Sequence, residues 1–237
     1  MLVIEFIGLP GAGKSTVSGK LIRKLQSSGL AVPELHNVKG LRRSGNSPLA
    51  LSKVIFAALR SSLFYRVMRQ IWLKALQDRS KFWRFFVLLK SNLTLQTLRQ
   101  QQWDVIVLEE GRAQNIVAMS VTGSVLDSSR LIDVVYGAAS DHLFVLLDID
   151  ISVAIERVRN RETIGRFSRE NPELEKLMMR HLSGVASLSA ILSNRFPLLS
   201  LAATDASDEN SDKIVAWATE RIASSKKNTL PAIGTTG

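Results

Sequence analysis

The sequence predicts an α/β fold in which a parallel sheet lies between two layers of helices. Apolar runs at 2–7, 103–108 and 142–147 are typical of strands buried on both faces. These runs alternate with longer segments of helical periodicity, which is the order that parallel strands with helical crossovers require. A glycine-rich turn joins the first run to the first helical segment. With 237 residues, 46% of them apolar, the chain is long enough to bury one substantial core.

The first half of the chain contains two strands separated by helical segments. After the strand at 2–7, apolar side chains recur at helical spacing, namely Val17, Leu21, Ile22 and Leu25. This helix should run from about Gly13 to Gln26, because Ser28 and Gly29 then stop it. A weak extended piece at 31–36 precedes a helical region, 48–102, that contains neither Gly nor an internal Pro. The buried strand at 103–108 closes this half.

The second half repeats the order of strand and helix. We expect a helix over 115–139, broken near Gly123, and then the strand at 142–147. The remaining elements are helices at 152–161 and 172–194, a last strand at 196–203 and a last helix at 212–223. We therefore assign residues 1–224 to one domain. The small and polar residues of 225–237 predict a disordered tail.

The turn after the first strand matches a phosphate-binding loop. The pattern G-x-x-x-x-G-K-[ST] is filled by Gly8, Gly13, Lys14 and Ser15. Glycines there let consecutive backbone N–H groups curl around a phosphate. Lys14 would neutralise the β- and γ-phosphates, and the Ser15 hydroxyl would bind Mg²⁺. The residues expected to hold the nucleotide are Gly8, Pro10, Gly11, Ala12, Gly13, Lys14, Ser15 and Thr16.

Two carboxylates follow the strand at 103–108, at the edge of a parallel sheet where ligands bind. Adjacent strand residues point to opposite faces, so we expect only one of Glu109 and Glu110 to face the phosphate loop. We prefer Glu110 for the metal or the acceptor and keep Glu109 as the second choice. The structural alternative is a carboxylate that caps the next helix. Arg112, two residues further on, is a candidate contact for an acceptor phosphate.

A later cluster of arginines supplies cations for a moving phosphoryl group. Arg157 and Arg161 are four residues apart on one helical face, and Arg166 follows a glycine that would act as a hinge. The planar guanidinium grips phosphate oxygens bidentately. The alternative is a solvated helix in which Glu156 and Glu162 pair with these arginines.

Together these motifs resemble the thymidylate kinase-like branch of the P-loop nucleotide and nucleoside kinases. The resemblance covers nearly the whole order of elements. It rests on the phosphate loop, on the acidic strand end, and on the run from Val145 to Asp150 that leads into Ala154-Ile155-Glu156-Arg157 and then to Arg161 and Arg166. The ending at 198–205 is similar to the adenine-side strand of that family, which implies base contacts near Ala203 and Asp205.

The resemblance implies an ATP-dependent phosphotransferase that uses Mg²⁺, has a lid at 156–170 and forms a homodimer. Its catalytic residues would be Lys14, Glu110, Arg112, Arg157, Arg161 and Arg166, with Ser15, Glu109 and Glu110 as candidates for the metal. Family members carry Asp-Arg or Glu-Arg-Ser where this chain has Glu109-Glu110-Gly111-Arg112. The acceptor, a phosphate-bearing or other small molecule, and the choice between ATP and GTP therefore stay open.

The stretch from Lys39 to Trp103 holds thirteen lysines and arginines and accounts for the whole excess of positive charge, which is +10 overall. Asp78 is the sole acidic residue of that stretch, and aromatic residues are interleaved with the cations. Four interpretations stand side by side: a subdomain for a polyanionic acceptor, a surface for anionic lipid, a nucleic-acid patch, or an aromatic core with solvated cations outside. The second and third lead to a rival function, a nucleotide-gated binding protein that hydrolyses its nucleotide slowly.

Composition excludes several classes of chemistry. The chain has no cysteine, which excludes disulfides, thiolate nucleophiles and Cys-ligated zinc. His36, His142 and His181 are scattered without metal-ligand spacing, so a metal would be bound through oxygen. No uncharged run approaches the roughly 18 residues of a membrane span. Because the first strand occupies the place of a signal peptide, we expect a cytoplasmic protein.

Overall fold

A computed structural model describes residues 1–34, 79–122, 127–137, 140–161 and 167–229 of the chain. The strands in these ranges are β1 (Leu2–Gly8), β2 (Val105–Leu108), β3 (His142–Asp148) and β4 (Leu198–Ala202). The helices are α1 (Lys14–Ser27), α5 (Arg79–Arg99), α6 (Arg112–Val121), α7 (Ser128–Tyr136), α8 (Ile151–Arg159), α9 (Leu174–Ser193) and α10 (Ser207–Thr229).

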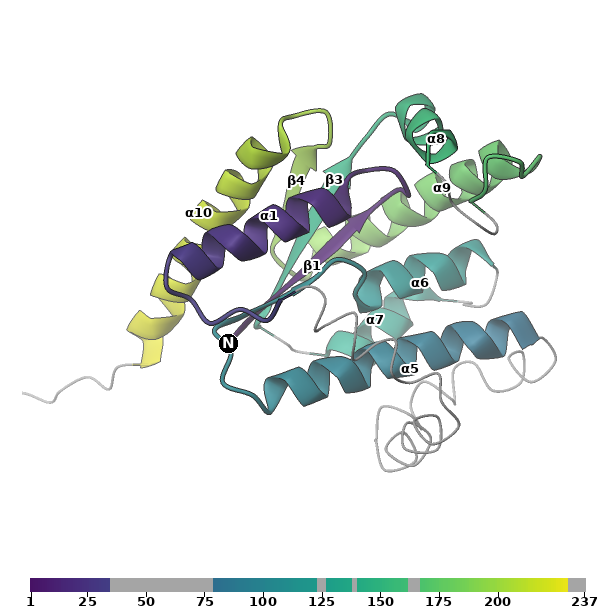
Figure 1. Cartoon of the computed structure of the whole chain (residues 1–237). Coiled ribbons are helices and arrows are strands. Elements are labelled where there is room, and N and C mark those ends of the chain that lie inside the picture. The colour runs from purple at the N-terminus through teal and green to yellow at the C-terminus, as the bar shows by residue number, and fades with distance from the viewer. Residues whose placement is uncertain (35–78, 123–126, 138–139, 162–166, 230–237) are drawn as a thin grey trace, which may run out of the picture.

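The strands form one parallel sheet in the order β2-β1-β3-β4 (Figure 1). All residues of β1 and β2 are buried, because helices cover both faces. Helices α1 and α10 pack together on one face, while α6 and α9 pack together on the other, with α5 against α6. The three-layer α/β fold predicted from the sequence is therefore confirmed. Since the strands are parallel, the loops that follow β1, β2 and β3 share one edge of the sheet.

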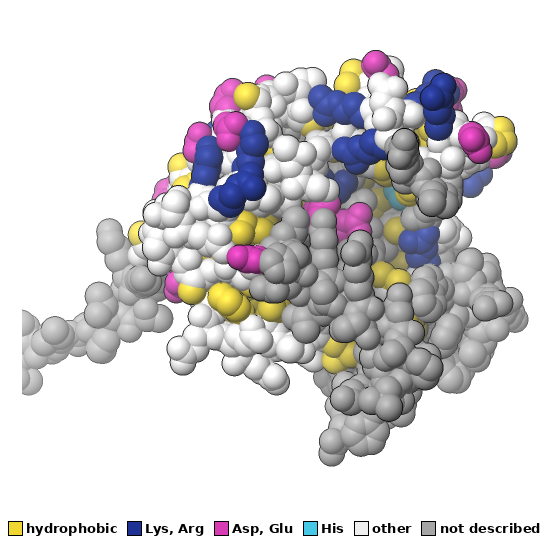
Figure 2. All heavy atoms as spheres, viewed as in Figure 1, with side chains coloured by type: hydrophobic (Ala, Val, Ile, Leu, Met, Phe, Trp, Pro, Cys, Tyr) yellow, Lys and Arg dark blue, Asp and Glu magenta, His cyan; other side chains and the backbone are white. Residues whose placement is uncertain are grey.

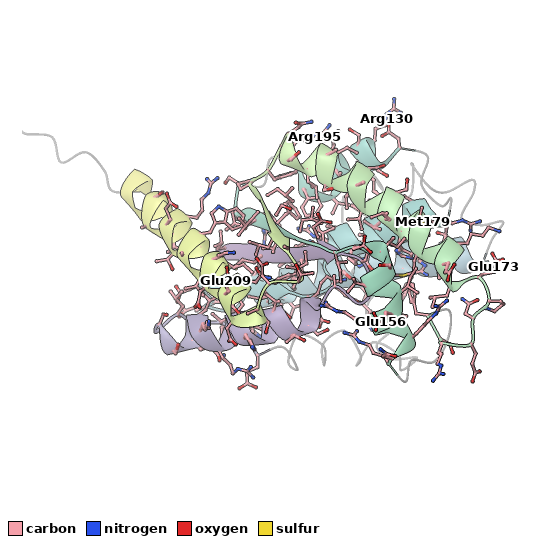
Figure 3. All side chains as sticks on the ribbon, turned by 90° about the horizontal axis from the view of Figure 1, so that it is seen from above. Arg130, Glu156, Glu173, Met179, Arg195 and Glu209 are labelled. Carbon is pink, nitrogen blue, oxygen red and sulfur yellow. The ribbon has the colours of Figure 1, made fainter. Side chains whose placement is uncertain are left out.

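Helix α9 packs against α6 on one face of the sheet and against α7 at one of its ends. Glu173 precedes one end of α9 and Arg195 follows the other, where Arg130 of α7 also lies (Figure 3). The Arg195 guanidinium pairs with Asp133 and donates to the hydroxyl of Ser129 at 2.8 Å, which ties α9 to α7. Along its length α9 approaches α6 closely: a Cβ on Gly184 would lie 3.2 Å from the Ser120 hydroxyl. This close packing fixes the position of α6, which begins directly after the acidic end of β2.

Two expected elements differ in part from the structure. Of the extended piece expected at 31–36, residues 31–34 are described and form no strand, and Ala31 exchanges hydrogen bonds with Asp104 at 2.8 and 2.9 Å, just before β2. The helix expected over 115–139 with a break near Gly123 is confirmed as two helices, α6 and α7, although residues 123–126 themselves lie outside the described ranges. Helix α6 starts earlier than expected, at Arg112, and α7 is capped by Asp127, whose carboxylate accepts from two backbone N–H groups.

Of the helical region expected over 48–102, the described part is α5. Phe85, Phe86 and Leu89 are buried, as the interpretation of its aromatic residues as core predicts. Residues 48–78 lie outside the described ranges, so the other interpretations of the basic region remain predictions. Helix α10 continues to Thr229, past the point where the disordered tail was expected to begin, and 230–237 lie outside the described residues. Among the helices that the structure describes, none is both long enough and apolar enough to cross a membrane.

Candidate active site

The loop between β1 and α1 has the backbone conformation that its glycine pattern predicts. Gly11 and Gly13 have φ values of 88° and 83°, in the left-handed region that favours glycine. A Cβ on Gly11 would lie 2.7 Å from the carbonyl oxygen of Ala154, so α8 packs directly on the loop. Helix α1 begins at Lys14, so the positive end of its dipole faces the loop. The loop is thus shaped to bind an anion.

Lys14 is buried beneath this loop. Its Nζ donates to the carbonyl oxygens of Gly8 at 2.9 Å and of Leu9 at 2.8 Å. Burial lowers the pKa of Lys14 to about 8, although the nearby carboxylates of Glu110 and Glu109 oppose that shift. The ammonium group is therefore held close to the loop and to two negative charges.

Both carboxylates after β2 reach the loop, which corrects the expectation that only one of them would. The strand ends at Leu108, so Glu109 and Glu110 lie in a turn, where the alternation of a strand no longer applies. Glu109 is half-buried and accepts a hydrogen bond from the hydroxyl of Ser15. Glu110 is exposed, and both carboxylates line the same cavity as Lys14 and Ser15.

A cavity of about 360 Å³ extends from the loop to α5, α6 and α9. Figure 2 shows carboxylates near the centre of this face, with basic side chains beside them toward α8. The phosphate loop, the start of α1 and the turn after β2 contribute Pro10, Gly11, Gly13, Lys14, Ser15, Glu109 and Glu110. The other lining residues are Arg84, Val87, Gln114, Asn115, Ala118, Val158, Arg161, Phe167 and His181. The cavity therefore joins a phosphate site to a second region of mixed chemistry.

Several of these lining residues have no local signal in the sequence. Arg84 comes from α5, Phe167 precedes α9 and His181 lies on α9, and the rings of Phe167 and His181 lie 5.4 Å apart. Only tertiary packing brings them to the loop. Gln114 is different, because it lies one turn after the acidic residues and its side-chain oxygen accepts from the Gly8 N–H at 3.3 Å. Its place just after the acidic motif was the one available sequence signal.

The three arginines of the predicted cationic cluster have different positions. Arg161 is exposed and lines the cavity. Arg157 is half-buried and donates to the carbonyl oxygens of Gly11 and Ala203, at 3.5 Å in both cases. Arg166 lies outside the described residues. Glu156 is exposed on α8 (Figure 3) and forms no ion pair with Arg157 or Arg161 in the described part of the chain.

Arg157 connects the loop after β4 to the phosphate loop, because it donates to a carbonyl oxygen of each. The Ala203 N–H donates to the carbonyl oxygen of Asp148 at 2.7 Å, which holds this loop to the end of β3. Asp205 pairs with Lys213 at 3.3 Å. Neither Ala203 nor Asp205 lines the cavity described above, so the base contacts implied for them remain a prediction.

Arg112 is buried beneath the cavity and does not line it, which corrects the expectation that it contacts an acceptor. Its guanidinium donates to Asn92 at 3.2 Å and to the carbonyl oxygen of Val135 at 3.0 Å. It also lies 2.5 Å from Nε2 of His142 and 3.4 Å from the carboxylate of Glu5. Arg112 therefore joins α5, α6, α7, β1 and β3 instead of binding a ligand.

Glu5 is the anion at the centre of this buried network. It stands in an apolar strand, and its only sequence signal is that isolated charge. Its carboxylate accepts from the Ala113 N–H at 3.1 Å and from the Tyr136 hydroxyl at 2.8 Å. Burial, and then the Glu5 charge, raise the pKa of Tyr136 well above its ordinary value. Glu5 thus caps the N-terminus of α6 from inside the core. This helix begins shortly after Glu109 and Glu110.

Gly111 lies against this carboxylate, which leads to a prediction about stability. A Cβ at Gly111 would lie 2.3 Å from Oε2 of Glu5, and the network holds that oxygen in place. We expect Gly111→Ala to lower the free energy of unfolding by about 1 to 3 kcal/mol in urea denaturation. The matched control is Gly19→Ala in α1, where a Cβ meets nothing within 4 Å. This control should raise stability by roughly 0.5 to 1 kcal/mol, so equal effects at the two sites would contradict the prediction.

The oxygen donors at the loop fit Mg²⁺. Ser15 and Glu109 bring a hydroxyl and a carboxylate into contact, and both are ligands that Mg²⁺ prefers. No three His, Asp or Glu side chains gather into a metal site within the described ranges. Mg²⁺ would be bound by Ser15 and Glu109 together with phosphate oxygens and water, as at nucleotide sites generally.

The fold is similar to that of solved nucleoside kinases. Three structures of deoxyadenosine kinase from M. mycoides match with TM-scores of 0.55, 0.53 and 0.54, and they hold dCMP with a flexible dCDP, dCTP and dATP respectively. Their sequences are 16%, 16% and 15% identical to this one, and each match covers 92% of this chain and 100% of the kinase. No protein-family model and no curated protein sequence matches the chain. The chain thus shares the α/β fold of these structures, and the narrower resemblance to thymidylate kinases stays a prediction.

Proposed function

We propose that this protein is an ATP-dependent phosphotransferase of the nucleoside and nucleotide kinase type. The observation that carries the proposal is the meeting of the glycine loop, Lys14, Ser15 and two carboxylates in one cavity. Phosphoryl transfer needs a phosphate cradle, a metal site, a carboxylate near the nucleophile and cations around the moving group. The likeness in fold to deoxyadenosine kinases supports the same conclusion.

In this mechanism the protein acts mainly by positioning and by charge. The loop N–H groups and Lys14 would hold the β- and γ-phosphates, and Ser15 and Glu109 would hold Mg²⁺. When bound, Mg²⁺ neutralises charge on the phosphate oxygens. An acceptor oxygen forms a bond to the γ-phosphorus while the bond to the ADP oxygen breaks, and the acceptor proton passes to Glu110. Arg161 lines the cavity on the other side and stabilises the charge of the transition state.

The test of this function is ADP release by the purified protein with Mg-ATP. The acceptors should include deoxynucleosides, nucleoside monophosphates, and sugar and lipid phosphates, with the product identified by mass spectrometry. ADP release that an acceptor stimulates, together with a phosphorylated product, would establish the phosphotransferase. Tight ATP binding without stimulation by any acceptor would contradict it and favour the nucleotide-gated binding protein.

Glu110 should be essential for turnover but not for nucleotide binding. We expect Glu110→Gln to lower kcat by about 10² to 10⁴, the usual contribution of a general base, with little change in the Kd of Mg-ATP. Glu109→Gln should instead weaken the binding of Mg²⁺, because Glu109 is the carboxylate that contacts Ser15. The control is Glu220→Gln, an exposed site on α10. Full turnover by Glu110→Gln would place the proton acceptor elsewhere.

A further inference from the structure

Arg84 of α5 is a cation of the cavity that the mechanism above does not use. It lines the wall that α5 and α6 form with Val87, Asn115 and Ala118. At the loop, burial lowers the pKa of Lys14, the charges of Glu110 and Glu109 raise it, and the charge of Arg161 lowers it further. Burial alone accounts for the lowered pKa of Arg84. The cavity therefore joins the phosphate loop and its two carboxylates to a wall of α5 and α6 on which Arg84 is the charged lining residue.

Arg84 differs from Arg112 and Arg157 because no described residue accepts a hydrogen bond from it or forms an ion pair with it. It is half-buried. By contrast, Arg112 pairs with Glu5, and Arg157 donates to two backbone carbonyl oxygens. A cation that is partly removed from water without a partner disfavours folding, and such costs are typical of functional sites.

The sequence around α5 provides almost nothing to neutralise this arginine. Between Lys39 and Trp103, lysine and arginine recur throughout and Asp78 is the sole acidic residue. The anion that completes the site is therefore expected from a ligand. Guanidinium groups bind phosphate and carboxylate oxygens through two parallel hydrogen bonds, which suits Arg84 to either group.

We infer that the acceptor carries an anionic group, a phosphate or a carboxylate, which Arg84 binds at the wall of the cavity that α5 forms. The inference rests on the proposed function and narrows its acceptor. The reacting oxygen of such an acceptor lies near Glu110, and its anionic group lies on the α5 side. Phe167 and His181 provide ring surfaces beside it, and Gln114 and Asn115 provide amide groups. The site is therefore expected to discriminate against neutral acceptors of the same shape.

The test compares acceptors that differ by one anionic group. Deoxyadenosine is paired with its 3′-monophosphate, and uridine is paired with orotidine, which adds a carboxylate to the base. Equilibrium binding is measured by calorimetry in the presence of Mg²⁺ and a non-hydrolysable ATP analogue, and ADP release is measured with Mg-ATP. In at least one pair we expect the anionic member to bind about tenfold to a hundredfold more tightly. Equal affinities within both pairs would overturn the inference.

Variants of Arg84 show whether this side chain is the cause. Arg84→Gln should remove the preference for the anionic member, and Arg84→Lys should keep part of it, because a point charge replaces the fork. The control is Arg221→Met, an exposed site on α10 that does not line the cavity. A preference that survives in Arg84→Gln would assign the anion to another residue and overturn the inference.

The Tm of the ligand-free protein provides a second test of the inference, which needs no acceptor. Because the charge of Arg84 has no anion among the described residues, Arg84→Met should raise the Tm of the ligand-free protein by about 2 °C or more. A lower Tm would show that Arg84 stabilises the fold, and would overturn the inference.

The two proposals fail in different ways. Phosphorylation of neutral nucleosides with no preference for anions leaves the phosphotransferase standing and removes the anionic acceptor. Binding of anionic acceptors through Arg84 without any ADP release would support the anionic acceptor site and contradict the phosphotransferase.

Discussion

Replacing Lys14 with alanine is expected to lower kcat by at least about a hundredfold while the protein stays folded. The ammonium group is the charge closest to the loop, where it is held by the carbonyl oxygens of Gly8 and Leu9. No other lysine lines the cavity among the described residues. The transferring phosphoryl group would therefore lose a cation that water cannot replace in a confined site. The measurement is steady-state ADP release at saturating ATP and acceptor.

The control for this variant lies on the same helix. Arg23 is exposed on α1 and does not line the cavity, so Arg23→Ala should leave kcat unchanged. Lys14→Ala should also keep its far-ultraviolet circular dichroism spectrum, since its aliphatic stem is a small part of the core. Unchanged turnover in folded Lys14→Ala protein would refute the mechanism. A loss of turnover that accompanies unfolding would be uninformative, so Lys14→Met, which retains the stem, is measured beside it.

The part of the site that the sequence predicts is the part that is local in the chain. The loop from Gly8 to Ser15 needs one turn of fixed backbone, and a short motif records each of its requirements. The positions of β1, β2 and β3 follow similarly from apolar runs, because strands buried on both faces leave a clear signal. The wall formed by Arg84, Phe167 and His181 depends on contacts between distant elements. No local pattern records those contacts.

The two corrections at the end of β2 have a common physical origin. The sequence shows where a strand can form but not the residue at which its regular geometry ends. Glu109 and Glu110 were assigned to opposite faces by the alternation of a strand, yet β2 ends before them. Arg112 was placed in the cavity because it follows the acidic residues, but α6 begins there and turns its side chain into the core. The charge that draws Arg112 inward, Glu5, is more than one hundred positions earlier in the chain.

Replacing Arg112 with methionine is expected to lower the free energy of unfolding more than any other substitution proposed above. Glu5 has no exposed surface and Arg112 is 4% exposed, so both charges are shielded from water. In Arg112→Met the carboxylate of Glu5 keeps the Ala113 N–H and the Tyr136 hydroxyl but loses its cationic partner. An uncompensated buried charge of this kind lowers the free energy of unfolding by about 3 to 5 kcal/mol. The measurement is urea denaturation followed by circular dichroism.

A double variant separates the cost of the orphaned charge from the loss of packing. Glu5→Gln combined with Arg112→Met removes both charges and keeps an acceptor for the Ala113 N–H, so it should be more stable than Arg112→Met alone. Arg130→Met on the exposed side of α7 should change stability by less than about 0.5 kcal/mol. A double variant that is no more stable than Arg112→Met would mean that packing of the guanidinium, and not its charge, holds α6 in place. In that case Glu109 and Glu110 would owe their position to the shape of the core, and the buried ion pair would be replaceable by apolar side chains of equal volume.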